Sequence, residues 1–132
     1  MVTYYHSNKD LDLDTHIFVF GSNKLGIHGA GAAKYAVKFF KAKYGVGEGL
    51  QGRSYAIPTK LTPYKFMSLE EIREGVDRFL DVASNMNEIF YLTPIGTGLG
   101  NHKHKDIANL FKVKLLDNIL YPYIWSIFLE ES

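Results

Sequence analysis

The 132-residue sequence predicts an α/β fold in which helices cover both faces of a largely parallel β-sheet. Two observations lead to this prediction. Apolar, β-branched runs of strand length alternate with amphipathic helical patterns, and glycines gather at the junctions between them. With 46% hydrophobic and 22% charged residues, the composition is that of one globular domain spanning residues 1–132.

Strands are expected at residues 2–5, 16–20, 54–58, 89–92 and 123–129, where apolar, β-branched and aromatic residues predominate. A helix is expected from Ser68, because Ser68 and Glu71 form a capping-box pattern ahead of apolar residues that recur every three or four positions. These apolar residues are Leu69, Ile72, Val76, Phe79, Leu80 and Ala83.

Two further helices are expected at about residues 30–44 and 105–118. The first should bury Ala33, Ala36, Val37 and Phe40, and the second Ile107, Leu110, Phe111 and Leu115. Lys34, Lys38 and Lys41 line the opposite side of the first helix. We interpret them as a solvated face, with a nucleic-acid surface as the alternative.

The composition excludes several chemistries. Without cysteine there is no disulfide, thiolate nucleophile or cysteine-bound zinc. A formal net charge of +1 argues against a partner selected by overall charge, although it allows a local basic patch. The N-terminus has no signal-peptide pattern, and no apolar run approaches the roughly 18 residues of a membrane span. We therefore expect a cytoplasmic protein with no membrane partner.

Eleven of the twelve glycines form three clusters, at residues 21–31, 45–52 and 96–100. The first and third clusters follow an expected strand and precede an expected helix, which is where open α/β sheets bind ligands. Glycine there lets backbone N–H groups approach an anion, so a phosphate or diphosphate is the expected ligand. Neither P-loop nor dinucleotide-binding spacing occurs. The alternative is that these glycines only form tight turns.

The same segments resemble the ligand loops of macrodomains. Phe-Val-Phe-Gly-Ser-Asn at 18–23, followed by Gly-Ala-Gly-Ala-Ala-Lys-Tyr-Ala at 29–36, is similar to their first loop. Thr-Pro-Ile-Gly-Thr-Gly-Leu-Gly at 93–100 is similar to their second. The resemblance spans residues 17–129 and is greatest to the compact branch with terminal ADP-ribose glycohydrolases and ADP-ribose-1″-phosphate phosphatases. It implies an α/β/α sandwich with a mixed, largely parallel sheet of about five to six strands, and ADP-ribose as ligand.

The sequence also departs from the macrodomain pattern. Ala32 and Ala33 stand where many macrodomain hydrolases have an aspartate after the first-loop glycines. The glycohydrolase branch has a lysine–aspartate pair. In this sequence Thr59 or Lys60 stands nearest to the position of that lysine, and Gly100 stands nearest to the position of that aspartate. Asp14 is the nearest counterpart of the aspartate that recognises adenine. A non-catalytic binding module is therefore a second reading of the resemblance.

The two loops supply the candidate site. The residues expected to contact the ligand are Gly21, Ser22, Asn23, Gly29, Ala30, Gly31, Ile95, Gly96, Thr97, Gly98, Leu99 and Gly100. Asn23 can hold ribose hydroxyls or orient a water, or simply cap its turn. His28 can transfer a proton, or be an inert loop residue. Lys60 can pair with a phosphate, or be an ordinary exposed lysine. These three are the catalytic candidates.

Other candidate residues are weaker. Ser22 lacks the second glycine of a nucleophile elbow, which disfavours acyl transfer. His102 and His104 have no further ligand to complete a metal site, so we expect neither a metal nor another cofactor. An aromatic residue within 121–128 can stack on adenine, although core packing explains that run equally well.

The sequence thus predicts a protein that binds ADP-ribose or a derivative, free or attached to a macromolecule. It further predicts hydrolysis of a phosphate or ADP-ribosyl linkage at the distal ribose. Binding without turnover is the first alternative, and a nucleic-acid interaction domain is the second.

Overall fold

The structure, a computed structural model, describes residues 2–98 and 101–130. Within these residues, seven strands form one sheet in the order β1-β7-β6-β2-β4-β3, with β5 paired to β4. They are β1 (Thr3–Tyr5), β2 (Ile17–Asn23), β3 (Gly49–Gln51), β4 (Ser54–Thr62), β5 (Lys65–Phe66), β6 (Phe90–Leu92) and β7 (Ile119–Pro122). Pairings among β1, β7, β6, β2 and β4 are parallel, whereas β3 and β5 run antiparallel to β4. The predicted mixed, largely parallel sheet is confirmed, with one or two strands more than expected.

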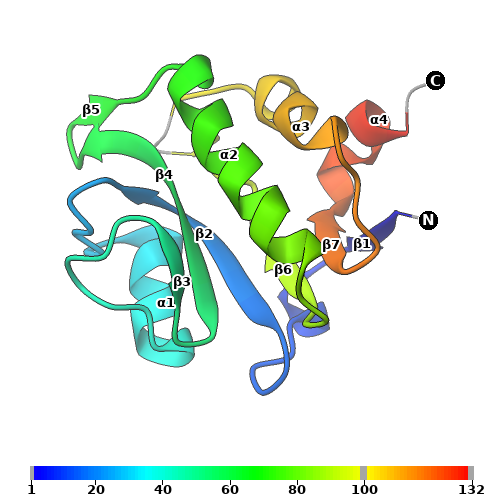
Figure 1. Cartoon of the computed structure of the whole chain (residues 1–132), viewed down its shortest axis with the longest axis horizontal. Helices are drawn as coiled ribbons and strands as arrows, with labels where there is room; N and C mark the ends of the chain where they lie inside the picture. The colour runs from blue at the N-terminus through cyan, green and yellow to red at the C-terminus, as the bar shows by residue number, and fades with distance from the viewer. Residues whose placement is uncertain (1, 99–100, 131–132) are drawn as a thin grey trace.

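Helices cover both faces of this sheet (Figure 1). Helix α1 (Gly31–Phe40) packs on one face over a small buried cluster that includes Phe18, Phe20 and Phe40. The other face carries α2 (Leu69–Ser84), α3 (His104–Lys112) and α4 (Ser126–Leu129) over a larger cluster. The predicted α/β/α sandwich is therefore confirmed.

Helix α2 begins as its sequence predicts. The Glu71 N–H donates to Ser68 Oγ, and the Ser68 N–H donates to Glu71 Oε1, so the capping box is complete. Leu69 is partly buried, and the rest of the predicted face is buried: Ile72, Val76, Phe79, Leu80 and Ala83.

Helices α1 and α3 end earlier than predicted. Helix α1 stops at Phe40 because Lys41 adopts a left-handed conformation, with φ of 60°, that closes the helix. Ala33, Ala36 and Phe40 are buried as expected, whereas Val37 is exposed. Helix α3 stops at Lys112, and Leu115 lies beyond it, partly buried.

The strand predicted at residues 123–129 is wrong. That segment forms a short 3-10 helix (Tyr123–Trp125) followed by α4, and the last strand, β7, precedes it. The buried residues Trp125 and Leu129 are four positions apart, which is a helical spacing rather than the alternation of a strand. The other four predicted strands are confirmed, and β2 and β4 extend further toward their carboxyl ends, to Asn23 and Thr62.

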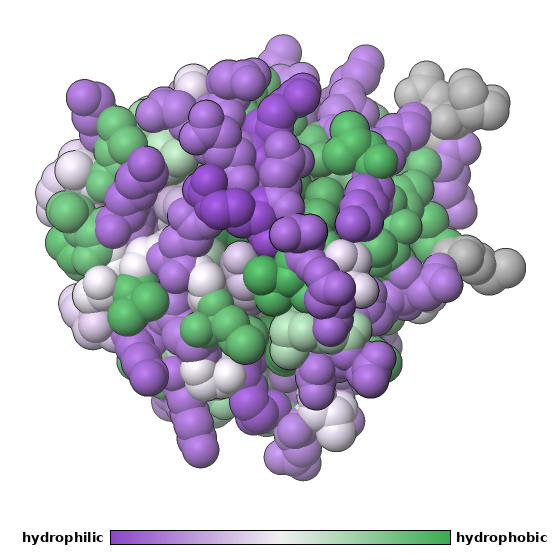
Figure 2. All heavy atoms as spheres, viewed as in Figure 1, coloured by the Kyte–Doolittle hydropathy of each residue, from purple (hydrophilic) through white to green (hydrophobic). Residues whose placement is uncertain are grey.

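On the face that carries α2 and α3, hydrophilic side chains predominate and hydrophobic ones form separate groups (Figure 2). In the part of the chain that the structure describes, no helix combines the length and apolar character needed to cross a bilayer.

Candidate ligand-binding site

The carboxyl ends of β2, β4 and β6 meet at one edge of the sheet, and the two predicted ligand loops lie there in contact. A Cβ built on Gly21 would lie 3.4 Å from both Thr59 Oγ1 and Ile95 Cβ and 3.5 Å from the Gly96 nitrogen. Gly21 of the first loop therefore packs directly against Ile95 and Gly96 of the second. The two glycine clusters that sequence analysis paired are adjacent in space.

A cleft of about 400 Å³ opens beside these loops, on the face of the sheet covered by α1. Its lining residues come from the N-terminal segment, β2, α1, β6 and the second loop: Tyr5, Asn8, Leu11, Phe18, Gly31, Ala32, Tyr35, Tyr91, Thr93 and Pro94. Four of these ten residues are aromatic. Tyr5 stacks on Tyr91 with ring centroids 3.9 Å apart, and Phe18 lies 5.3 Å from Tyr35.

Two tyrosines of the cleft, Tyr5 and Tyr91, are neutral at physiological pH. Burial raises the pKa of Tyr91 to about 12 and raises the pKa of Tyr5 further, and the neighbouring Tyr91 adds to the effect on Tyr5. The Tyr5 hydroxyl donates to the Leu92 carbonyl at 2.8 Å. These two side chains thus bring rings to the cleft without adding negative charge.

The amino end of α1 forms one wall of the cleft. The helix begins at Gly31, and its N-cap residue, Ala30, has no side chain that can accept a hydrogen bond from the first turn. The first turn also contains no acidic residue. Because first-turn N–H groups have no partner inside a helix and stand at the positive end of its dipole, Gly31 and Ala32 bring an anion-binding end to the cleft.

The second loop is held by its own polar atoms. The N–H and the hydroxyl of Thr93 both donate to the Val19 carbonyl, at 3.1 and 2.7 Å, which ties the end of β6 to β2. The Thr97 hydroxyl donates to the Pro94 carbonyl at 2.7 Å. A Cβ on Gly98 would meet no atom within 4 Å, so this end of the loop faces open space. Leu99 and Gly100 lie outside the described residues.

The middle glycine cluster, to which the sequence assigns no role, supports the first loop from behind. A Cβ on Gly47 would lie 2.4 Å from the Asn23 oxygen and 2.5 Å from the Lys24 oxygen, so the two backbones pack with no room for a side chain. Ser22 Oγ donates to the Gly47 carbonyl, and the Gly45 N–H donates to the Gly26 carbonyl. Segment 43–49 therefore fixes the shape of segment 22–26.

Gln51 holds segment 43–49 in turn. Its side chain is 4% exposed, accepts from the Lys43 N–H at 2.7 Å and donates to the Val46 carbonyl at 3.0 Å. A glutamine with both ends of its amide engaged fixes two points of this segment at once.

Asn23 uses its side chain to close its own turn. The amide oxygen accepts from the Ile27 N–H at 3.1 Å, and the amide nitrogen donates to the Ile27 carbonyl at 3.0 Å. The side chain is nearly buried. Asn23 therefore has the capping arrangement that sequence analysis gave as the alternative to ligand contact.

His28 is buried, with a side chain only 2% exposed, although the sequence places it in a surface loop. Its Nε2 lies 3.0 Å from the Val46 carbonyl, and because a carbonyl can only accept, Nε2 carries the proton. The ring packs edge-on against Phe20 and Tyr44. Within the described residues, Nδ1 is buried without a hydrogen-bond partner.

Lys60, the third catalytic candidate, lies beside Asn23 in the pairing of β2 with β4. Its Nζ stands 5.7 Å from the ring centre of Phe66, and its carbonyl accepts from the Lys24 N–H at 2.9 Å. Lys60 is thus close to the first loop by its backbone and to β5 by its side chain. All three catalytic candidates belong to the first loop or adjoin it. Their side chains nevertheless contact different partners: Ile27 for Asn23, Val46 for His28 and Phe66 for Lys60.

The remaining sequence candidates lie elsewhere or have other partners. His102 Nε2 lies 2.8 Å from the Met67 carbonyl, and His104 Nδ1 accepts from the Trp125 indole at 3.1 Å. Among the described residues, no group of three or more His, Cys, Asp or Glu side chains could hold a metal ion. Asp14 precedes the amino end of β2 and is not among the residues that line the cleft. None of the aromatic residues at 121–128 lines the cleft.

The cleft aromatics were missed by sequence analysis. Tyr5, Phe18, Tyr35 and Tyr91 belong to four different elements, and only the three-dimensional structure brings them together. The one sequence signal that could have found them is that Tyr5 stands at the end of the first strand, where the neighbouring parallel strands also end.

The fold agrees with the one that the sequence resemblance implies. A mixed, largely parallel sheet between helices, with two glycine loops at its carboxyl edge, is the arrangement that the resemblance to macrodomains implies. No protein-family model matches the sequence, and no curated protein matches it.

Solved structures do match. The macrodomain of Mycobacterium tuberculosis DarG is 22% identical, with a TM-score of 0.65 over 92% of this chain and 97% of that chain. The macrodomain of Thermus aquaticus DarG is 18% identical, with a TM-score of 0.68 over 93% of this chain and 97% of that chain. The chain has the macrodomain fold.

Proposed function

We propose that the protein binds ADP-ribose or a close derivative in the cleft beside α1. The observation that carries this proposal is the pairing of an aromatic cleft of about 400 Å³ with an uncapped helix amino end in its wall. Aromatic rings suit an adenine base, and helix N–H groups suit a diphosphate. The macrodomain fold of the similar structures supports the same ligand.

In this proposal the diphosphate lies between the first turn of α1 and the second loop. Gly31 lines the cleft with φ of +57°, and Gly98 faces open space. The distal ribose then lies toward the ends of β2 and β4, near Thr59 and Lys60. Leu99 and Gly100 stay among the expected ligand contacts.

Calorimetric titration with ADP-ribose tests this binding, and Gly98→Val is the informative variant. A Cβ built on Gly98 meets no protein atom within 4 Å, and the backbone there is not left-handed, so stability should change little. If the diphosphate passes this loop, affinity should fall by about 2 kcal/mol or more, which is roughly 30-fold. Absence of wild-type binding at millimolar ADP-ribose would refute the proposal. Unchanged affinity in Gly98→Val would remove the second loop from the site.

We also propose that the bound ligand is hydrolysed at its distal ribose, at a phosphate or ADP-ribosyl linkage. Asn23 is then a positioning residue, because its amide shapes the turn that faces the ribose. Lys60 and His28 are the candidates for proton transfer. For His28 to take part, the first loop must open, since both ring nitrogens are enclosed.

Chromatographic assay of ADP-ribose-1″-phosphate and of ADP-ribosylated substrates separates hydrolysis from simple binding. Lys60→Gln or His28→Ala should lower turnover by about 10²- to 10⁴-fold with affinity nearly kept, whereas Asn23→Ala should lower both. His28→Ala needs a stability control, because it empties a buried site. Binding without any product would favour the non-catalytic module.

A further inference from the structure

The last helical segment of the chain carries apolar side chains that the candidate ligand site does not use. The 3-10 helix after β7 and helix α4 bury Trp125 and Leu129 on one side. On the other side Tyr123 is 52% exposed, Ile124 is 58% exposed and Ile127 is 72% exposed. Residues three or four positions apart share a helix face, so these three side chains lie together. We call Tyr123, Ile124 and Ile127, with the partly buried Phe128, the α4 patch.

The α4 patch lies at one end of the sheet. The Tyr123 ring packs edge-on against Tyr4 of β1, the end strand, with ring centroids 6.1 Å apart, and its centroid is 4.3 Å from that of His6. Hydrophobic side chains gather on the right of Figure 2, where Figure 1 places α4 and β1. Single exposed apolar side chains are ordinary, whereas a contiguous group of them is typical of a surface that another molecule covers.

Exposed charges of opposite sign flank the α4 patch. A depression of about 500 Å³ beside Ile127 has Lys105 of α3 and Glu130 among its lining residues. Both of these side chains are exposed. Glu130 lies toward β1, because its charge, after burial, helps to raise the pKa of Tyr4. The patch therefore has a cation from α3 and an anion toward β1.

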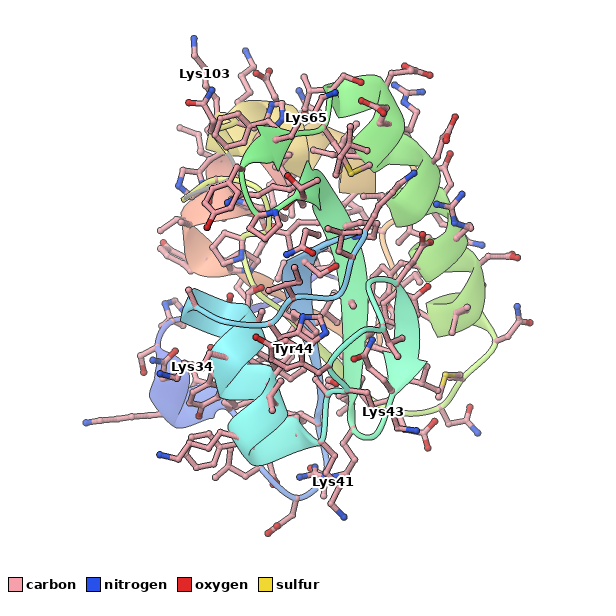
Figure 3. The ribbon with its side chains drawn as sticks, turned by 90° about the vertical axis from the view of Figure 1, so that its left-hand side faces the viewer. Lys34, Lys41, Lys43, Tyr44, Lys65 and Lys103 are labelled. Atoms are coloured by element: carbon pink, nitrogen blue, oxygen red, sulfur yellow. The ribbon has the colours of Figure 1, made fainter. Side chains whose placement is uncertain are left out.

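The exposed apolar side chains of α1 have a different setting. Tyr35 and Phe39 are both exposed, with ring centroids 4.7 Å apart, and the Lys38 Nζ stands 5.2 Å from the centre of the Phe39 ring. Helix α1 contains lysines and no acidic residue. The side of the molecule at the left of Figure 1, away from α4, carries further lysines: Lys34, Lys41, Lys43, Lys65 and Lys103 (Figure 3). Two copies that met there would bring like charges together.

We propose that two copies of the chain associate through the α4 patch about a two-fold axis. In such an interface the same surface lies on both sides, so the exposed isoleucines and tyrosine of each copy cover those of the other. An axis that passes between Lys105 and Glu130 brings the lysine of each copy to the glutamate of the other. A second copy thus matches the patch in both apolar character and charge, by symmetry alone.

The second copy would stand beside the cleft and not in it. None of the residues of the α4 patch lines the cleft. His6 stacks on Tyr123, and the preceding residue, Tyr5, lines the cleft, so the interface would adjoin one cleft wall. The inference does not require ADP-ribose binding, because it rests on apolar exposure and charge.

Sedimentation equilibrium of the full chain, free of ADP-ribose and at about 50 mM salt, tests the inference. The unsubstituted protein should show a monomer–dimer equilibrium with a Kd of roughly 10–100 µM, because an interface built on four apolar side chains per copy is at the small end of specific interfaces. Ile127→Asp should weaken association roughly 100-fold, since it brings two carboxylates into contact with apolar surface. The matched control is Val113→Asp, because Val113 is 70% exposed and lies in a different depression, beside α2. Its dimer should dissociate within about twofold of the unsubstituted value.

A charge exchange tests the two-fold arrangement. Lys105→Glu should weaken association roughly tenfold at low salt, because both pairs across the interface become pairs of like charge. Addition of Glu130→Lys to that variant should restore the affinity to within about threefold, because the two charges then change places. Thermal midpoints, measured at a concentration where all variants are monomeric, provide the folding control.

Three results would overturn the inference. A monomer at every concentration up to about 300 µM would do so, and would assign the patch to a chain of different sequence. An equal loss in Val113→Asp and Ile127→Asp would show a general effect of added charge. A double variant that associates as weakly as Lys105→Glu would exclude the two-fold pairing. Gly98→Val should dimerise normally, and Ile127→Asp should keep its ADP-ribose affinity, so failure of this inference is distinguished from failure of the proposed function.

Discussion

Replacement of Gly47 by alanine should lower the stability of the protein, because the added Cβ would overlap the backbone of the first loop. The added Cβ would stand 2.4 Å from the Asn23 oxygen, 2.5 Å from the Lys24 oxygen and 2.7 Å from the Lys24 carbonyl carbon. These are backbone atoms, so no side-chain rotation relieves the overlap. To reach an ordinary contact of about 3.4 Å, one segment must move by up to about 1 Å, against the bonds of Ser22 and Gln51 that hold the segments in place.

Overpacking of this kind costs about 1–3 kcal/mol and occasionally more, so we expect a loss of about 3 kcal/mol in the free energy of unfolding. For a chain of this size the thermal midpoint should fall by roughly 10 °C. Urea unfolding, followed by fluorescence of the single, fully buried tryptophan, Trp125, measures the change.

Two other glycines separate the steric effect from the loss of glycine itself. Gly45→Ala meets no atom within 4 Å but has φ of +88°, so only backbone strain of about 1–2 kcal/mol is expected. Gly98→Ala has open space and no positive φ, and should change stability by less than about 0.5 kcal/mol. If Gly47→Ala is as stable as Gly98→Ala, the tight packing of segment 43–49 against the first loop is wrong.

Three further predictions concern the helix side of the sheet and the titrating groups. Trp125→Phe should lower the free energy of unfolding, measured by circular dichroism, by about 2–3 kcal/mol. The substitution opens a cavity and leaves His104 Nδ1 without its hydrogen-bond donor. A change below about 0.5 kcal/mol would contradict this prediction. Burial raises the pKa of Tyr121 to about 12 from 10.0, so the stability it contributes is complete below pH 10 and lost as pH rises toward 12. Urea unfolding at pH 9 and pH 11.5 should show that Tyr121→Phe loses less unfolding free energy at alkaline pH than the unsubstituted protein does. An equal loss in the two proteins would refute this prediction. Hydrogen bonds from Ser68 lower the pKa of Glu71, so its contribution is present above pH 4.5 and lost as pH falls below that value. Glu71→Gln should therefore flatten the acid limb of the thermal midpoint, and an unaltered limb would argue against the capping box.

Local sequence signals were enough to predict the framework of the fold. The capping box at Ser68 and Glu71 identified the start of α2, and glycine clusters after apolar runs identified the two loops that meet at the carboxyl edge of the sheet. The signals failed where packing between distant segments decides the structure. Tyr123 to Leu129 has the composition of a strand, but Trp125 and Leu129 pack as a helix against α3.

Side-chain roles at the site depended on the same distant contacts. His28 was expected on the surface because it lies among glycines, yet Val46, eighteen residues away, and the rings of Phe20 and Tyr44 enclose it.

The backbone-to-backbone packing of segments 22–26 and 43–49 also bears on the entropy of ligand binding. Ordering one residue of a free loop costs about 1–2 kcal/mol at room temperature. Six residues, 23–28, are already ordered by contacts within the protein. The free-energy cost of ordering these six residues, roughly 6–12 kcal/mol, therefore arises when the chain folds. A ligand that bound beside the first loop would not have to offset this cost.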